Sequence, residues 1–500
     1  MWEHLYDITF PSQEGREKLY FCSQNVKPAE AGISLKKGES VDLGTYFNSF
    51  SLEKWARYTD ITAVRLRLCL KGRCRISFYG KNARGTVAIE VVKAEGDFEK
   101  VFSVQELRKK EMVLLGVSLA AEEGPAVLQG GSWTGEFPAA DKVKIGITIC
   151  TFKREQYVRQ NIRILENYLK QNADYKVLVI DNGNTLQEVK TGPVQILHNR
   201  NFGGAGGFTR GMLEYVKEGL VDYVLLMDDD IQLEVSSLDR LYSLLRHLTE
   251  GHKKQMIGGA MLRMDQPTVQ FENTAYWNRI RMRALGRGFD LTDAMTLCQN
   301  EMLPEKINKY AAWWFCCIPL AVIRENGYPL PVFVKGDDME YGIRNRRDII
   351  TMNGIGVWHE PFVKKANPVV NYFNDRNMLI INHYAEGCNR FTFGLTLFAR
   401  LARRILEKDW DSVKLFPLAV TDHGDGFREI TKIGADEKLT YIQNEARLSD
   451  RKSLVNAVLS SIWSGIRQMA RFSDIHRQYM DFRCYELKDM SFWVKYLKID

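Results

Sequence analysis

The sequence has no apolar run long enough to cross a membrane. Its longest one, residues 310–323, is shorter than the roughly 18 residues that a spanning helix needs, and it contains Pro319. The first ten residues carry acids and no apolar stretch, so we expect no signal peptide. We therefore expect no transmembrane helix.

Cysteine is present but lacks the spacing of metal or disulfide sites. The nine cysteines are scattered, and Cys316 and Cys317 are adjacent, so they cannot form a C-x-x-C ligand pair. An odd number of scattered cysteines favours reduced thiols in a cytoplasmic protein over a disulfide framework. The formal net charge of +7 is mild for 500 residues. It favours anionic partners such as phosphates or lipid head groups, and it does not indicate nucleic acid.

Short β-strands dominate the first part of the chain, from about Phe10 to Gly131. Apolar and polar residues alternate over residues 64–70 and 75–79, a further strand fits residues 86–92, and glycines lie between these runs. This pattern predicts an N-terminal β-sandwich or jelly-roll domain over residues 1–138, with a linker marked by residues 130–132 and Pro138. Such a module often binds sugars, and a structural or oligomerising role is the alternative.

Strands and helices alternate in the next part of the chain. We expect strands at residues 143–150, 176–180, 195–198 and 223–227, and helices at residues 156–171, 206–219 and 236–247. The alternation predicts an α/β domain with a mostly parallel sheet, whose ligands bind at the carboxyl ends of the strands. We assign this domain to residues 139–385 and a C-terminal helical domain to residues 386–500, with helices at residues 390–410 and 452–472.

Three aspartates follow the expected strand at residues 223–227. In an extended chain Asp228 and Asp230 point the same way, so both carboxylates can face one hard cation such as Mn²⁺ or Mg²⁺. The alternative is a solvated acidic turn, but the apolar strand delivers this motif to the edge of the sheet where ligands bind. His359 follows another expected strand, and as a neutral imidazole it could complete the metal site; a structural histidine is the alternative.

Three other polar clusters also stand at expected strand ends. Backbone amides, Thr151 and Arg154 could hold a uracil ring and a diphosphate, and Asn182 in the D-N-G sequence could contact a base or ribose. D-N-G is also an ordinary turn. The glycines that follow Asn201 let the backbone approach a donor sugar closely. NAD binding is disfavoured because the acid expected after a second βαβ strand is missing.

Two adjacent carboxylates, Asp337 and Asp338, follow a short apolar run. An inverting sugar transfer needs one carboxylate to take the proton of the acceptor hydroxyl, and a neighbouring acid would raise its pKa or hold the acceptor. The alternative is a pair of acids in the first turn of a helix, and both interpretations can hold together. Upstream, Trp313 and Trp314 offer flat faces to a sugar, with buried core tryptophans as the alternative.

The motifs T-F-x-R, D-N-G, N-x-G-G-x-G-G-F, D-D-D, W-W, D-D-x-E-x-G and W-H follow one another between Thr151 and His359. This order resembles the family 2 glycosyltransferases of the GT-A (nucleotide-diphospho-sugar transferase, Rossmann-like) fold. Among these the polymerising galactofuranosyltransferases of actinobacterial cell walls are the most similar. D-x-D is shared by many transferases, whereas the combination of G-G-x-G-G-F with W-W and D-D-x-E is far more specific. The resemblance covers almost the whole chain.

The resemblance implies a role for each matching position. Asp228 and Asp230 would bind a divalent metal, with His359 as the third ligand. Asp338 would be the catalytic base and Asp337 an acceptor-binding carboxylate. The positions implied around UDP are Thr151, Phe152, Arg154, Asn182, Asn201, Gly204, Asp228 and Asp229, and those implied around the acceptor also include Trp313 and Trp314.

The activity that the resemblance implies is an inverting, metal-dependent transfer of galactofuranose from UDP-galactofuranose to a hydroxyl of a lipid-linked glycan. It also implies a homo-oligomer in cell-surface polysaccharide biosynthesis at the cytoplasmic face of the membrane. Arg400, Arg403, Arg404 and Lys408 make the helical tail basic, which favours docking on that surface; a solvated face of a helical bundle is the alternative.

Three questions stay open from the sequence. The donor could be another nucleotide sugar, carrying rhamnose or galactopyranose, or the chain could be a non-catalytic carbohydrate-binding protein. Members of the family often carry a tryptophan just before the paired aspartates, where this sequence has Gly336. The chain is also shorter than the actinobacterial polymerases, so the acceptor and the linkage could be those of another glycan, such as an O-antigen or capsule.

Overall fold

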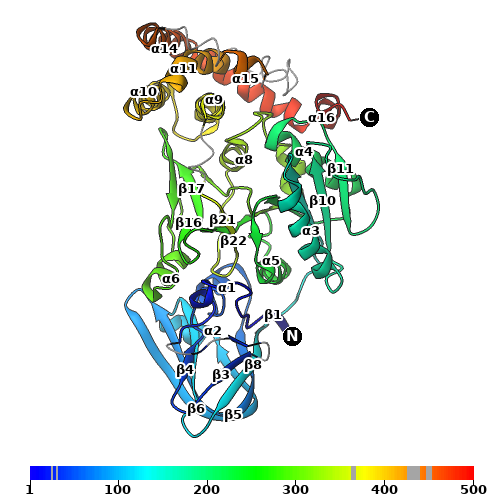
Figure 1. Cartoon of the computed structure of the whole chain (residues 1–500), viewed down its shortest axis with the longest axis vertical. Helices are drawn as coiled ribbons and strands as arrows, with labels where there is room; N and C mark the ends of the chain where they lie inside the picture. Colours follow the sequence, from blue (N-terminus) through cyan, green and yellow to red (C-terminus); the bar gives the residue numbers. More distant parts are fainter. Residues whose placement is uncertain are drawn as a thin grey trace.

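The computed structural model describes residues 1–23, 26, 28–29, 32–361, 367–424, 440–445 and 453–499. Lys452, where the last expected helix starts, lies outside these residues. The β-rich N-terminal part lies at one end of the long axis and helices α10, α11 and α14 at the other (Figure 1). No helix in the described ranges is long and apolar enough to cross a membrane.

A long bent hairpin builds the N-terminal domain. The first half of β5 (Ala63–Asn82) pairs with β8 (Ala126–Glu136) and the second half with β7 (Leu114–Ala120), while β6 (Gly85–Ser103) follows β5 along its length. Phe78 in the second half packs on Phe98 and Phe102, which pair with the first half. The hairpin therefore folds over on itself, and the sandwich consists of one continuous eight-stranded sheet.

The linker expected at residues 130–132 is wrong. Gly130, Gly131 and Ser132 pair with β5 inside β8. Glycine is needed there because a Cβ on Gly131 would lie 2.5 Å from the carbonyl oxygen of Arg67. The connection to the next sheet runs from the end of β8 to β9. The remaining elements of this part are β1 (Trp2–Asp7), η1 (Glu17–Leu19), β2 (Pro28–Ala29), β3 (Gly32–Leu35), β4 (Ser40–Asp42), α1 (Leu52–Tyr58) and α2 (Val104–Lys109).

The central sheet has the strand order β11-β10-β9-β12-β20-β14-β21. Its first four strands are parallel, whereas β20 runs antiparallel to both neighbours. Every strand and helix expected between residues 143 and 247 is present. The elements are β9 (Ile145–Thr151), α3 (Glu155–Leu169), β10 (Tyr175–Asp181), β11 (Val194–His198), α4 (Gly203–Glu218), β12 (Tyr223–Asp228), α5 (Val235–His247), β14 (Met256–Gly258), β20 (Cys316–Pro319), α7 (Leu320–Asn326) and β21 (Ile349–Ile350).

Two smaller sheets are separate from the central one. The first has the order β13-β22-β15-β16, in which residues 232–233 pair with residues 357–358 from far along the chain. The second has the order β18-β17-β19. Their elements are β13 (Gln232–Leu233), β15 (Ala260–Arg263), β16 (Gln270–Glu272), β17 (Thr274–Trp277), β18 (Met282–Leu285), α6 (Ala294–Glu301), β19 (Lys309–Tyr310), α8 (Asp337–Asn345) and β22 (Gly356–His359).

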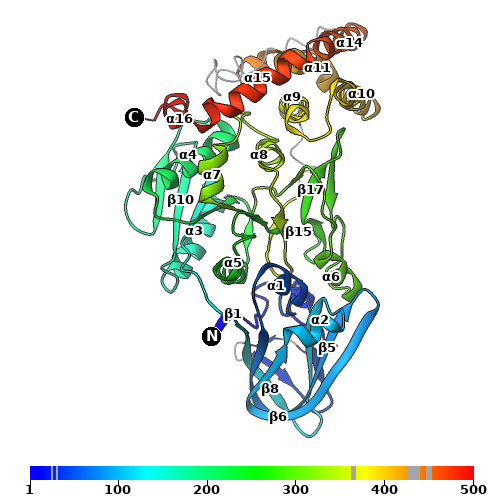
Figure 2. The ribbon, with the colours of Figure 1, turned by 180° about the vertical axis from the view of Figure 1, so that it is seen from behind.

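The C-terminal helices begin earlier than the sequence pattern suggests, with α9 (Pro368–Tyr384). Seen from behind, α15 crosses above the central domain and leads to α16 (Figure 2). There Tyr496 packs on Phe202 at the start of α4, with 4.9 Å between the ring centroids. The other helices are α10 (Arg390–Leu406), α11 (Trp410–Gly424), α14 (Leu454–Ala470), α15 (Phe472–Cys484), η3 (Glu486–Lys488) and α16 (Met490–Leu497). The division into three domains at residues 138 and 385 stays a prediction.

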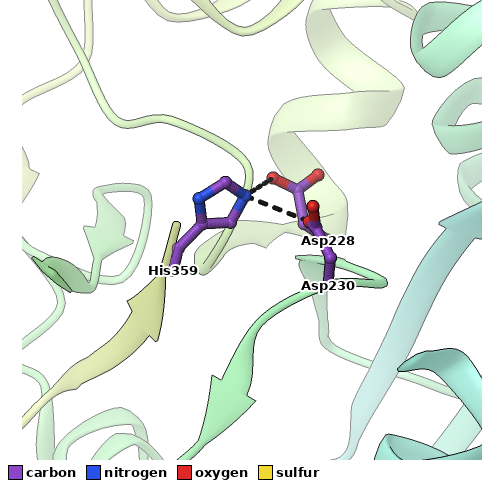
Figure 3. Close-up of side chains that lie close together, drawn as sticks. All are labelled: Asp228, Asp230 and His359. Atoms are coloured by element: carbon purple, nitrogen blue, oxygen red, sulfur yellow. Dashed lines mark ion pairs between the residues drawn. The ribbon is translucent and has the colours of Figure 1, made fainter. Parts of the chain in front are cut away.

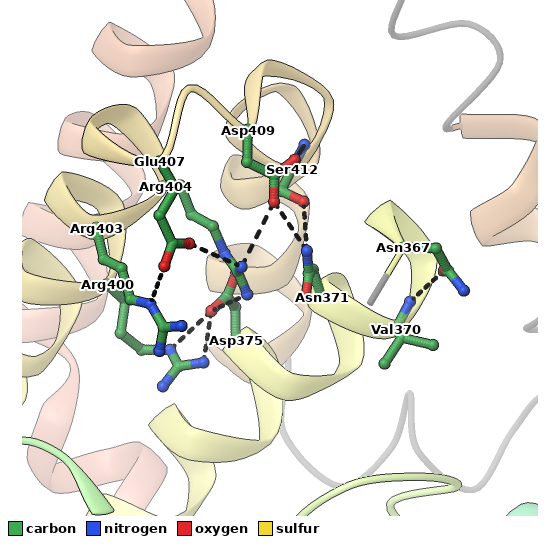
Figure 4. A network of polar contacts seen from close by, with 10 residues as sticks. All are labelled: Asn367, Val370, Asn371, Asp375, Arg400, Arg403, Arg404, Glu407, Asp409 and Ser412. Atoms are coloured by element: carbon green, nitrogen blue, oxygen red, sulfur yellow. Dashed lines mark hydrogen bonds and ion pairs between the residues drawn. The ribbon is translucent and has the colours of Figure 1, made fainter. Parts of the chain in front are cut away.

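Two of the four basic residues expected to face lipid instead anchor α10 (Figure 4). Arg400 and Arg404 form ion pairs of 2.6 Å and 3.1 Å with Asp375, which is buried on α9. Both arginines thus neutralise a carboxylate inside the helical bundle, because a buried carboxylate needs cationic partners. Arg403 lies on the exposed side of α10 and pairs with Glu407.

Candidate active site

Asp228, Asp230 and His359 come together although they stand on different sheets. Asp228 ends β12 of the central sheet, and His359 ends β22 of the neighbouring one. One ligand atom from each residue lies within 4.8 Å of the others. His359 Nε2 is 3.0 Å from Asp230 Oδ1 and 3.9 Å from Asp228 Oδ2 (Figure 3).

The hydrogen bond on the far side of the imidazole fits a metal ligand. His359 Nδ1 lies 2.6 Å from the carbonyl oxygen of Glu360, which can only accept, so Nδ1 carries the proton. Nε2 is the ring nitrogen that faces the two carboxylates, and it would offer its lone pair to a cation bound between them. This backbone bond fixes the tautomer in the way usual for metal-binding histidines. Two carboxylates and one imidazole suit a divalent cation of the Mn²⁺ or Mg²⁺ kind.

Asp229 points away from this cluster and binds the end of β9. Its carboxylate accepts a hydrogen bond of 2.7 Å from Thr151 Oγ1 and one of 3.2 Å from Arg154 Nη1, and Arg154 also pairs with Asp230 at 2.5 Å. Burial raises the pKa of Asp229 to about 6 despite these partners. Thr151 and Arg154 therefore hold the acidic turn in place. Phe152 lies beside them with 44% of its surface exposed.

Asn182 and Asn201 both bind the start of the glycine-rich helix α4. The Asn182 side-chain amide donates to the carbonyl oxygen of Gly203 at 2.9 Å, and its oxygen accepts from Asn199 at 2.8 Å. Asn201 Oδ1 accepts from the backbone N–H of Gly203 at 3.1 Å. The two motifs that the sequence analysis singled out separately are thus one hydrogen-bonded unit.

The glycines at the start of α4 allow a close approach to the segment that carries the paired aspartates. Gly203 has a φ of 72°, and a Cβ on it would lie 2.0 Å from the carbonyl oxygen of Phe333. A Cβ on Gly204 would lie 3.3 Å from Asp337 Oδ2. The N-terminus of α4 therefore faces the Asp337 carboxylate, where the partial positive charge of a helix start favours an anion.

Asp337 and Asp338 form the first turn of α8, as the structural alternative predicted. Asp338 Oδ1 accepts from the N–H of Met339 at 2.7 Å. Burial raises the pKa of both carboxyls above the usual range, and the charges of their neighbours, including Asp228, add to this effect. Two adjacent acids in such a place tend to share one proton near neutral pH. Gly336 caps this helix with a φ of 88°, a conformation that disfavours any side chain, including the family's tryptophan.

Glu272 is a buried acid that the sequence analysis did not single out. It ends β16 with only 2% of its surface exposed, and burial raises its pKa to about 7. Its negative charge helps to raise the pKa of Asp338. No motif surrounds Glu272 in the sequence, and its only signal is an acid within a short run of strand residues.

Trp313 and Trp314 are each only 4% exposed. Trp313 packs edge-on against Phe208 and Tyr341, and the Trp314 indole N–H donates to the carbonyl oxygen of Gly259 at 2.9 Å. These contacts favour the core alternative for both side chains. Their role at the acceptor stays a prediction.

Two regions of the chain match known protein families. Residues 17–133 match the family described as galactofuranosyltransferase 2 N-terminal, and residues 147–305 match glycosyl transferase family 2. The chain thus carries a family 2 glycosyltransferase domain, which contains the three aspartates at residues 228–230. The predicted fold class is confirmed: an α/β domain of GT-A type between an N-terminal β-domain and C-terminal helices.

The curated relatives that match this chain are galactofuranosyltransferases. The chain is 27% identical over 387 residues to galactofuranosyltransferase GlfT2 of Mycolicibacterium smegmatis and 27% identical over 389 residues to that of Mycobacterium tuberculosis. Each match covers 71% of this chain, but only 59% and 60% of the respective relative. The resemblance predicted from the sequence is therefore confirmed. A crystal structure of Staphylococcus aureus TarS 1-349 aligns over 66% of this chain and 91% of its own, at 14% identity and a TM-score of 0.37.

Proposed function

We propose that this protein is an inverting, metal-dependent glycosyltransferase that transfers galactofuranose from UDP-galactofuranose to a hydroxyl of a glycan. The observation that carries the proposal is the convergence of two acidic clusters: Asp228 and Asp230 meet His359 at the carboxyl edge of the sheet, and the Asp337–Asp338 pair lies near enough for Asp228 to raise its pKa. Both relatives named above are galactofuranosyltransferases, which supports the donor.

Asp228, Asp230 and His359 would hold the metal, Mn²⁺ or Mg²⁺. When bound, such a cation neutralises charge on the diphosphate as UDP leaves. Arg154 holds the Asp230 carboxylate at 2.5 Å and thereby keeps its other oxygen toward His359. The guanidinium has five N–H donors, so those not engaged with the aspartates can bind the diphosphate. Thr151, Phe152, Asn182, Asn201 and Gly204 would line the nucleotide and the donor sugar.

Asp338 would act as the base. The acceptor hydroxyl gives its proton to the Asp338 carboxylate, and its oxygen attacks the anomeric carbon from the side opposite UDP. The bond from that carbon to the diphosphate oxygen breaks, and UDP leaves with the electron pair, which inverts the anomeric configuration. The raised pKa of the Asp337–Asp338 pair suits this role, because a base with a pKa closer to the working pH accepts a proton more readily. Asp337 and Glu272 would hold the acceptor.

Two neighbouring C-terminal helices support a site of action at the inner face of the cell membrane. α10 and α14 pack against each other, since a Cβ on Gly465 would lie 2.9 Å from Leu397. Their outer sides carry exposed apolar residues at helical spacing, among them Phe398 at 70% and Trp463 at 72% exposed. With Arg403 at its border, this surface fits the head-group region of an anionic membrane and thus a lipid-linked acceptor.

The galactofuranosyltransferase resemblance also supports a homo-oligomer.

The test is UDP release by the purified chain with Mn²⁺ across a panel of nucleotide sugars. The panel includes UDP-galactofuranose, UDP-galactopyranose and dTDP-rhamnose, each with and without an alkyl galactofuranoside acceptor. We expect acceptor-stimulated release from UDP-galactofuranose only. UDP release from another nucleotide sugar alone would contradict UDP-galactofuranose as the donor but leave the proposed mechanism intact. Absence of both release and metal-dependent UDP binding would contradict the enzymatic proposal.

A further inference from the structure

The proposed metal ligands Asp230 and His359 are joined by one short pair of strands. β13 begins two residues after Asp230, and β22 ends on His359. The strands pair antiparallel, with Gln232 opposite Trp358 and Leu233 opposite Val357. Because β13 has only two residues, few backbone hydrogen bonds fix this register. The distance between the two ligands therefore depends on what holds β13 against β22.

One arginine of the N-terminal domain spans this strand pair. The Arg16 guanidinium lies 3.7 Å from the ring centroid of Trp358 on β22 and donates a hydrogen bond to Gln232 Oε1 on β13. Arg16 is only 7% exposed. A desolvated guanidinium over an indole forms a strong cation–π contact, and its planar fork allows the simultaneous hydrogen bond. Arg16 thus contacts both members of one of the two facing pairs that join the ligand strands, Gln232 and Trp358.

Further contacts fix the segment that carries Arg16. The Tyr20 hydroxyl donates to Glu234 at the start of α5, directly after β13. Tyr20 also stacks on Phe47, at 4.6 Å between ring centroids, and Phe47 in turn packs on Trp358 at 5.8 Å. The segment that carries Arg16 is therefore held in place by aromatic packing, which fixes the position of the guanidinium.

We infer that the N-terminal domain is part of the metal centre, with Arg16 as a positioning residue that sets the spacing of Asp230 and His359. This inference rests on the metal site of the proposed function. It gives the N-terminal domain a task that requires no glycan binding. Replacement of Arg16 keeps all three proposed metal ligands but removes the contact that holds β13 against β22, the strands next to Asp230 and His359.

Mn²⁺ binding to the full chain in the presence of UDP, followed by the electron paramagnetic resonance signal of free Mn²⁺, tests this inference. We expect Arg16→Ala to weaken Mn²⁺ binding by roughly tenfold, the lower end of the range found when groups bonded directly to metal ligands are removed, because Arg16 acts through the neighbours of two ligands. We also expect excess Mn²⁺ to restore UDP release in this variant, which a general loss of fold would not allow. Gln232→Ala, which removes only the hydrogen bond, should weaken binding in the same direction.

Arg65→Ala is the matched control. Arg65 lies 4.6 Å from the ring centroid of Trp2 and donates to Thr134 at 3.1 Å, so it combines the same two contacts within the N-terminal domain itself. This variant should bind Mn²⁺ like the wild type. Unchanged Mn²⁺ affinity in folded Arg16→Ala and Gln232→Ala would overturn the inference, as would an equal loss in Arg65→Ala. A wild-type chain that binds no Mn²⁺ would instead refute the proposed metal site.

Discussion

Replacement of Asp338 by asparagine separates base catalysis from binding. The asparagine side chain has the same shape, and its oxygen can keep the 2.7 Å hydrogen bond from the N–H of Met339 in the first turn of α8. The substitution also removes one charge from a carboxyl pair whose pKa values are raised, so repulsion with Asp337 falls. We therefore expect a fold at least as stable as the wild type, with metal and UDP binding retained.

The expected loss of rate follows from the proton that has no acceptor. A positioned general base contributes roughly 10²–10⁴-fold to a transfer, so kcat should fall by about 10³-fold, or about 4 kcal/mol of barrier. The assay is transfer from UDP-galactofuranose to an alkyl galactofuranoside, with UDP and Mn²⁺ binding measured by calorimetry on the same preparation. A variant that keeps more than about one tenth of the wild-type kcat would refute the assignment of Asp338 as the base.

Asp293→Asn serves as the control for this experiment. Asp293 also stands at a helix start, where its carboxylate accepts from the N–H of Thr296 at 2.7 Å. Its side chain is exposed and belongs to α6, which is not part of the proposed site. This variant should transfer sugar at the wild-type rate. A parallel loss in both variants would point to a general effect of replacing helix-capping aspartates.

Three more perturbations test other parts of the site. Gly203→Ala should lower the melting temperature and weaken UDP binding, since its φ of 72° costs alanine about 1–2 kcal/mol and its Cβ would meet Phe333. Glu272→Gln should move the acid limb of the kcat/KM pH profile to lower pH, because removal of its negative charge makes deprotonated Asp338 easier to form. Trp463→Ser should lower the fraction of protein that sediments with anionic lipid vesicles, while transfer to a water-soluble acceptor stays unchanged.

Each of these three variants has a matched control in the chain. Gly192→Ala tests a glycine that also has positive φ, 97°, but has open space at its Cβ, so UDP binding should persist. Glu250→Gln changes a glutamate that is 88% exposed and should leave the pH profile unmoved. Leu220→Ser changes a residue of the central domain that is 64% exposed and should not affect vesicle binding. An effect in a control equal to that in its partner would contradict the corresponding explanation.

Local patterns in the sequence were sufficient for the first part of the central domain, up to residue 247. The strand that delivers Asp228 and the helices α3, α4 and α5 follow from apolar periodicity, which reflects burial on one side of a regular element. The N-terminal β-domain followed from alternation in the same way. The exception was the glycine pair at residues 130–131, which reads as a linker because glycine serves both in loops and where strands approach closely.

The sequence by itself determined the elements of the central domain up to residue 247, the order of the motifs and the resemblance that assigns the glycosyltransferase domain. Only the tertiary structure decided which side chains meet. It placed the charge of Glu272 where it raises the pKa of Asp338, and it turned Arg400 and Arg404 inward onto Asp375. It also set Arg16 across the strands of two proposed metal ligands. The physical reason is that periodicity reports the environment of one element, whereas contacts between distant segments depend on sheet order and register, which no local pattern encodes.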